Sequence, residues 1–190
     1  RIHDFILRHT DPIDHIAFTA GAEHLTSIMA NAFLSDAQRW VVDGDEFSSM
    51  LFWHAVEEIE HKSVCIDVLQ HLDDSYARRI AGFALLTGIL FGGMLSRQLY
   101  MLAVDGELRR PATWARLARL YLGARYRDGG PGVLRLIGRD YLQYLRPGFH
   151  PWDEDDRHLV EKWVAAFERG EAVRALRLAD VAAAPASRAA

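Results

Sequence analysis

The stretch WHAVEEIEHKSVCIDV, residues 53–68, carries the strongest fold and chemistry signal in this chain. Drawn as a helix, it places His54, Glu58 and His61 within about 60° of one another, on a side otherwise made of apolar residues. Glu60 and Asp67 fall on the opposite side, where a solvated helix surface is expected. A buried carboxylate without a partner costs several kcal/mol, so this apolar side predicts a compensating partner for Glu58.

The spacing Glu58-x-x-His61 lets one helix offer a carboxylate and an imidazole, one turn apart, to the same metal ion. A buried Glu–His ion pair or a hydrogen-bonded core histidine is the alternative interpretation. A second predicted helix carries Glu23 among small and apolar residues. We therefore predict a metal site with Glu23, Glu58 and His61 as ligands. No catalytic residue beyond these ligands is assigned.

Four further residues are candidates for additional ligands or for groups that orient a ligand. His54 shares the side of Glu58, and Glu57 lies at its edge. His24 is rotated by about 100° from the residue before it, so an orienting or interhelical role competes with plain packing. His3 stands at the start of the chain, in residues that already have a helical pattern.

Caps and breakers predict a chain of helices, and no useful alternation of polar and apolar residues predicts a strand. The expected helices cover about 11–34, 46–72, 76–104, from 111 onward, 133–145, 155–168 and 171–180. The segment Arg146-Pro147-Gly148-Phe149-His150-Pro151-Trp152 is expected to be a non-helical loop that closes the bundle, with a substrate-contacting role for His150 as the alternative. The fold class is all-α, with one helical metal-binding domain over 1–180 and a disordered tail over 181–190.

Composition excludes collagen-like, disordered and disulfide-scaffold classes, because 50% of the 190 residues are hydrophobic and 25% are charged. One cysteine, Cys65, cannot form an internal disulfide, and the N-terminus lacks the pattern of a signal peptide. We expect a cytoplasmic protein, with membrane association as an open alternative.

Residues 80–96 contain no charged side chain over 17 positions. A buried bundle helix is the favoured interpretation, and an interfacial membrane contact or a membrane span are the alternatives. Residues 108–146 carry nine arginines and two aspartates. These arginines and the aromatic residues among them suit anionic headgroups, whereas nucleic-acid binding is not expected because no binding motif accompanies them.

Three strings together resemble the bacterial family of predicted metal-dependent hydrolases: AEHLT at 22–26, WHAVEEIEHKSV at 53–64 and RPGFHPW at 146–152. The resemblance reaches to about residue 169. It implies a ferritin-like bundle, here incomplete at the N-terminus and with extra C-terminal helices. It also implies another glutamate and another Glu-x-x-His upstream of Arg1, so residues 1–10 are expected to be the remnant of an upstream helix.

We expect this protein to be a metal-dependent enzyme, and the favoured reaction class is hydrolysis. The alternatives are a di-iron oxidase or oxygenase, and a membrane-surface protein that handles lipids. Carboxylates with histidines favour iron or manganese, with zinc as a further option, in a site expected to be dinuclear in the full-length protein. The expected partners are a small-molecule substrate of apolar or lipid-like character, a peripheral membrane contact and a second copy in a homodimer.

Overall fold

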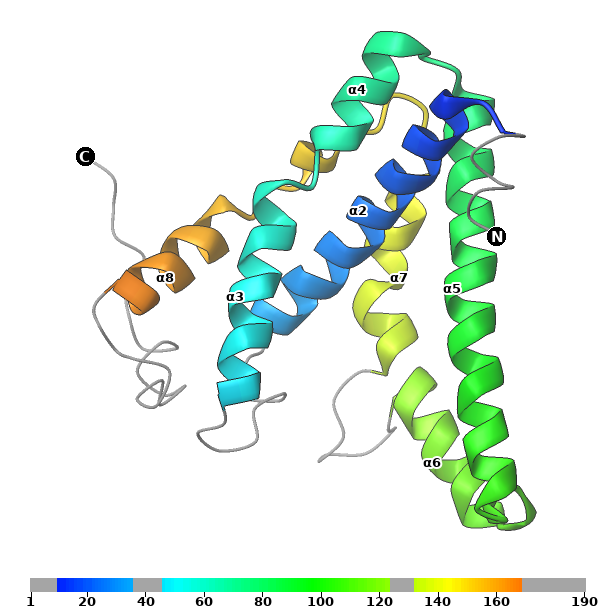
Figure 1. The fold of residues 1–190 in the computed structure, drawn as a ribbon. Helices are drawn as coiled ribbons and strands as arrows, with labels where there is room; N and C mark the ends of the chain where they lie inside the picture. The colour runs from blue at the N-terminus through cyan, green and yellow to red at the C-terminus, as the bar shows by residue number, and fades with distance from the viewer. Residues whose placement is uncertain (1–9, 36–45, 124–131, 169–190) are drawn as a thin grey trace.

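The computed structural model describes residues 10–35, 46–123 and 132–168, and this part of the chain consists of helices and connecting turns without a β-strand. The all-α prediction is confirmed. The helices are α2 (Pro12–Ser35), α3 (Glu46–Glu60), α4 (Val64–Leu72), α5 (Tyr76–Val104), α6 (Pro111–Leu122), α7 (Val133–Gln143) and α8 (Arg157–Glu168), with the short 3-10 helices η2 (Glu107–Arg109) and η3 (Pro151–Asp153) (Figure 1). The expected helix at 171–180, the tail at 181–190 and the first nine residues lie outside the described residues.

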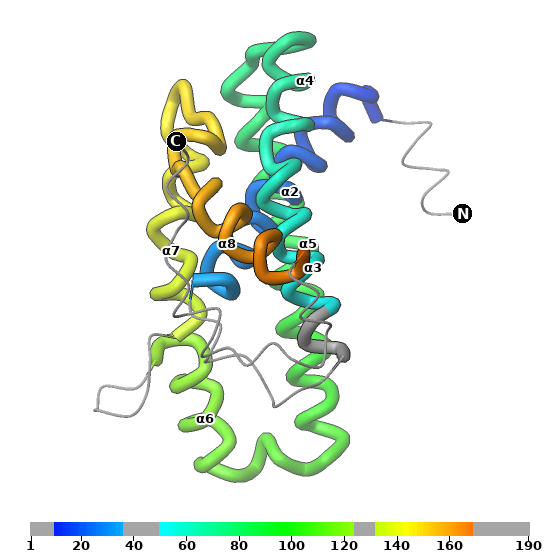
Figure 2. Tube along the Cα trace, turned by 90° about the vertical axis from the view of Figure 1, so that its left-hand side faces the viewer, coloured from blue at the N-terminus to red at the C-terminus, as the bar shows by residue number. Residues whose placement is uncertain are grey.

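Helix α2 is the central element, and it packs against α3, α4, α5 and α7 (Figures 1 and 2). Its closest neighbour is α5, because Gly82 lets the two backbones touch. A Cβ atom built on Gly82 would lie 2.6 Å from the backbone carbon of Ala17. A helix with neighbours on most of its sides has to be apolar around much of its circumference, as α2 is.

The core divides into clusters along α2. At its C-terminal end, Leu34 packs with α3 and α8, where the rings of Phe52 and Trp163 stack with centroids 4.6 Å apart. At its N-terminal end, Ala17 packs with Ile66 of α4 and with a group of aromatic rings from α5 and from the chain after α7. Helix α2 therefore contributes to both core clusters and connects them.

The stretch expected to be one helix over 46–72 is two helices. Helix α3 ends at Glu60, the chain turns through residues 61–63, and α4 begins at Val64. No glycine or proline marks this break. It coincides with Lys62, whose side chain turns inward to a buried partner, Asp156, at 2.5 Å. The break between α3 and α4 thus coincides with a contact between two residues that are far apart in the sequence, Lys62 and Asp156.

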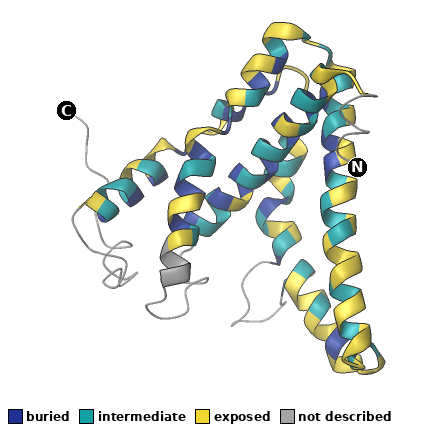
Figure 3. Cartoon of the chain, in the orientation of Figure 1, coloured by how far each residue is buried: buried dark blue, intermediate teal, exposed yellow. Residues whose placement is uncertain are grey.

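Helix α5 also differs from the favoured expectation of a buried bundle helix. Its buried residues are Arg79, Phe83 and Leu86, all in its N-terminal part. Beyond them, α5 and α6 extend past the other described helices and are largely exposed (Figures 1 and 3). Among the described residues, α5 is the one helix long and apolar enough to cross a membrane, judged by length and composition alone.

The segment after α7 closes the molecule over α4 and α5. Arg79 donates hydrogen bonds to the carbonyl oxygens of Tyr144, at 2.5 Å, and Arg146, at 2.8 Å. Further on, His150 bonds to Asp67 of α4, with 2.9 Å between Nε2 and Oδ1. This segment is non-helical apart from η3.

Candidate metal centre

Glu23 lies half-buried on α2 and reaches across to α4. Its Oε2 atom accepts a hydrogen bond from the backbone N–H of Cys65 at 2.8 Å. Cys65 is in the first turn of α4, where backbone N–H groups have no partner inside the helix and favour a negative charge. One oxygen of Glu23 thus caps α4.

Glu58 lies on α3 with 15% of its side chain exposed. Its Oε2 atom accepts a hydrogen bond from the Thr26 hydroxyl at 2.5 Å. Thr26 follows Glu23 by one helical turn on α2, so the two carboxylates stand at the same seam, between α2 on one side and α3 with α4 on the other. Glu23 and Glu58 therefore come from two helices to one region, and their role as metal ligands stays a prediction.

The two histidines of the same stretch lie toward solvent. His61 is exposed and sits in the turn between α3 and α4. His54 is 63% exposed, with its Nε2 atom 3.2 Å from Oε1 of Glu58. The helical side that carries them is not the core side of the helix, since Met50 and Val68 on it are 57% and 43% exposed.

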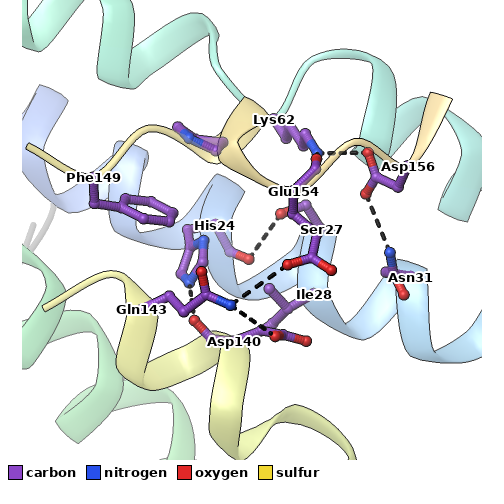
Figure 4. A pocket seen from close by; sticks show the side chains of 11 residues that line it. His24, Ser27, Ile28, Asn31, Lys62, Asp140, Gln143, Phe149, Glu154 and Asp156 are labelled. Atoms are coloured by element: carbon purple, nitrogen blue, oxygen red, sulfur yellow. Dashed lines mark hydrogen bonds and ion pairs between the residues drawn. The ribbon is translucent and has the colours of Figure 1, made fainter. Parts of the chain in front are cut away.

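His24 points away from this seam, although it follows Glu23 directly. Its ring is buried between α2 and the residues after α7, with Nε2 3.1 Å from the carbonyl oxygen of Asp140 (Figure 4). The rings of Tyr144 and Phe149 lie 4.8 Å and 5.0 Å from it. Burial lowers the pKa of His24 to about 4, so its imidazole is neutral near pH 7. The structure gives His24 a packing position.

A small cavity of about 30 Å³, lined by polar residues together with Ile28, Phe149 and Pro151, lies beside His24, on the side of α2 that faces α7 (Figure 4). Lys62 enters it and donates to Asp156 and, at 2.8 Å, to the carbonyl oxygen of Glu154. Asn31 donates to the other oxygen of Asp156 at 3.3 Å. This volume has room for one or two water molecules, which is too little for a substrate. This cluster could not be predicted from the sequence, because its members are far apart in the chain.

The remaining candidates are only partly placed. Glu57 is half-buried and accepts a hydrogen bond from Nε1 of Trp53 at 3.0 Å, and His3 lies outside the described residues. Within the described ranges, no three His, Cys, Asp or Glu side chains are gathered around one point as a metal ion requires. The half-buried carboxylates of Glu23 and Glu58 suit a divalent ion in their chemistry, and any complete site needs further donors.

The fold and the site together define the class of this protein. It is an all-α protein in which two half-buried carboxylates lie at one seam between helices. The model of a family described as predicted metal-dependent hydrolase matches residues 1–155, and the chain belongs to this family. No curated protein and no solved structure matches the chain. The family supports a metal-dependent hydrolase in general terms, and the matched region includes Glu23, Glu58 and His61.

Proposed function

We propose that this protein is a hydrolase whose divalent metal ion is held at the seam of α2 with α3 and α4 by Glu23, by Glu58 and by His61, which must turn from its exposed position toward the two carboxylates in order to bind. One observation carries the proposal. The Thr26 hydroxyl binds Glu58 one helical turn away from Glu23, so carboxylates from two helices face the same seam. Water-accessible but half-buried carboxylates are the donors that hard divalent ions prefer.

The contacts of the two carboxylates hold them in place at the seam. Glu23 and Glu58 each use Oε2 for a hydrogen bond to the protein, which fixes the carboxylate. Oε1 of Glu58 faces His54 at 3.2 Å, a distance at which the imidazole orients the carboxylate. His61 lies in the chain between two residues that contact α2. One is Glu58, which binds the Thr26 hydroxyl, and the other is Cys65, whose backbone N–H binds Glu23.

A divalent ion at this seam would act as a Lewis acid and lower the pKa of a bound water molecule toward neutrality. The carboxylate-rich donor set favours iron or manganese over zinc. We propose a ferritin-like, dinuclear arrangement, in which donors outside the described residues complete the site. His3 is the candidate for such a donor within this chain.

The experiment is a turnover assay on the metal-loaded protein, with a chromogenic ester and a chromogenic phosphodiester as probes. Reconstitution with Mn²⁺, Zn²⁺ or Fe²⁺ is expected to give turnover that a chelator abolishes. Glu58→Gln is expected to remove this turnover, whereas Glu60→Gln, at an exposed position on α3, should keep it.

Two outcomes would contradict the proposal. Equal turnover in Glu58→Gln and in the wild type would exclude Glu58 as a ligand. Oxygen consumption on addition of Fe²⁺, without turnover of either probe, would indicate an oxidase or oxygenase in place of a hydrolase.

A further inference from the structure

The end of the α5–α6 pair is an apolar projection. We define the distal hairpin as residues 94–122, from the last turns of α5 through η2 to the end of α6. It extends beyond the rest of the described helices in both views (Figures 1 and 2). Eight large apolar or aromatic side chains on it are each between 46% and 71% exposed: Met94, Leu95, Tyr100, Met101, Val104, Trp114, Leu120 and Leu122. Exposed apolar side chains in this number on one projection favour an interaction surface.

The distal hairpin is also basic within an acidic chain. It carries five arginines against Asp105 and Glu107, a net charge of +3, whereas the whole chain has a net charge of −4. Glu107 is already engaged, since it accepts from Arg110 at 2.6 Å and from the Thr113 hydroxyl at 2.8 Å. The other four arginines, Arg97, Arg109, Arg116 and Arg119, are exposed.

The two helices of the hairpin leave an open groove of about 410 Å³ between them. Its lining includes Leu102, Leu117 and Leu120, with Arg116 beside them. Leu120 belongs both to the exposed apolar set and to the groove, whose remaining lining residues, Gln98, Glu107 and Thr113, are polar. This combination of apolar surface and cationic border is typical of protein segments that bind at a membrane interface.

A membrane span by α5 does not fit the packing. The first part of the uncharged run 80–96 packs inside the protein, because Gly82 lies against the backbone of α2 and Phe83 is buried in the core. Only the part beyond these contacts is free to meet lipid. A symmetric contact between two copies through the same surface would bring hairpins of equal positive charge together, which is unfavourable.

We propose that the distal hairpin docks on the surface of an anionic lipid bilayer. Met101, Val104 and Trp114 enter the boundary between headgroups and acyl chains, and the arginines contact the phosphate and carboxylate groups of the lipids. Trp114 suits this boundary because its apolar ring is half exposed, while its N–H is satisfied by the carbonyl oxygen of Leu108 at 2.9 Å. The inference is independent of the metal site, which lies at the seam of α2 with α3 and α4.

The test is co-sedimentation of the whole chain with vesicles, either of phosphatidylcholine alone or with about one third phosphatidylserine. Binding is expected only to the anionic vesicles, and it should weaken as salt is added. An arginine near an anionic surface contributes about 1 kcal/mol, or about fivefold in binding, so Arg116→Gln/Arg119→Gln should weaken binding about 25-fold. The matched control is Arg135→Gln/Arg139→Gln, which removes the same charge from exposed positions on α7 and should bind within about twofold of the wild type.

A second pair of variants tests the apolar contact. Met101→Ser/Val104→Ser should weaken binding about tenfold, because both side chains are exposed in the free protein and enter lipid on binding. Leu85→Ser/Ile89→Ser removes two equally exposed apolar side chains of α5 outside the hairpin and should bind as the wild type does. All these positions are exposed, so the helix content measured by circular dichroism should not change.

Three results would overturn the proposal. One is absence of binding to the anionic vesicles at low salt. Another is an equal loss of binding in the α6 and α7 arginine variants, which would indicate general charge attraction. The third is a dimer in solution that Met101→Ser/Val104→Ser converts to a monomer, which would make the hairpin a contact between two copies.

Discussion

Replacing Lys62 by methionine is expected to be among the most destabilising single changes in this protein. The Lys62–Asp156 pair has only 3% and 5% of its side chains exposed, with 2.5 Å between Nζ and Oδ1. The ammonium group also donates to the carbonyl oxygen of Glu154 and lies 4.1 Å from the centre of the Trp152 ring. In the Lys62→Met variant, Asp156 keeps Asn31 as its side-chain partner, at 3.3 Å, and its charge stays buried.

The magnitude follows from the cost of an uncompensated buried charge. Breaking a buried ion pair by removing one partner costs about 3–5 kcal/mol, against a total stability of about 5–15 kcal/mol for a domain. Replacing both charges avoids that cost, so Lys62→Met/Asp156→Leu should be more stable than Lys62→Met. The double-mutant cycle should therefore show a coupling of about 2 kcal/mol or more between the two positions.

The assay is urea denaturation followed by far-UV circular dichroism, which gives the free energy of unfolding of each variant. The matched control is Lys162→Met on α8, which removes the other lysine of the chain from a half-buried position and should change stability by less than about 1 kcal/mol. The reasoning is refuted if Lys62→Met costs no more than this control, or if the two single changes simply add in the double variant.

Three further changes are expected to act through named contacts. Since burial lowers the pKa of His24 to about 4, the unfolded chain takes up its proton first as the pH falls. The free energy of unfolding should therefore drop by up to about 3 kcal/mol between pH 6.5 and pH 4, less so in His24→Gln, as measured by urea titration at several pH values. Gly82→Ala should lower Tm because its methyl group would meet the α2 backbone at 2.6 Å, whereas Gly88→Ala, at an open position, should keep or raise Tm. Thr26→Val removes the donor to Glu58 and should cost about 1 kcal/mol and weaken metal binding, while Thr26→Ser should retain both.

Helix starts could be predicted from the sequence because their signals are local. The Asp11 side chain accepts from the backbone N–H of Ile13 at 2.9 Å, and Ser75 accepts from that of Arg78 at 3.3 Å. Pro111 stands at the first position of α6, where it needs no N–H partner. Each of these helices begins within a residue of the predicted position.

The break between α3 and α4 could not be predicted in this way. The residues from Glu57 to Val64 carry no helix breaker, and a regular wheel therefore runs straight through them. Lys62 instead finds its partner at Asp156, 94 residues further along the chain. A tertiary contact of this separation leaves no pattern in a short window of sequence.

The core side of α3 was predicted wrongly for a related reason. Apolar residues occupy more than one side of this helix, so the wheel does not decide which side is the core. In the structure Phe52, Val56 and Ile59 form the buried side, packed with Trp163 of α8. That choice leaves Glu58 half-buried at the seam with α2 and turns His54 toward solvent.

Metal content per chain is the most direct test of the claim that Glu23, Glu58 and His61 hold a metal ion. The measurement is elemental analysis of protein purified without chelators. The wild type and Glu60→Gln are expected to carry the same amount of one divalent metal, because Glu60 is exposed and away from the seam. Glu58→Gln and His61→Ala are expected to have lost it while keeping their helix content. Equal metal in all four proteins, or none in the wild type after reconstitution, would contradict the account.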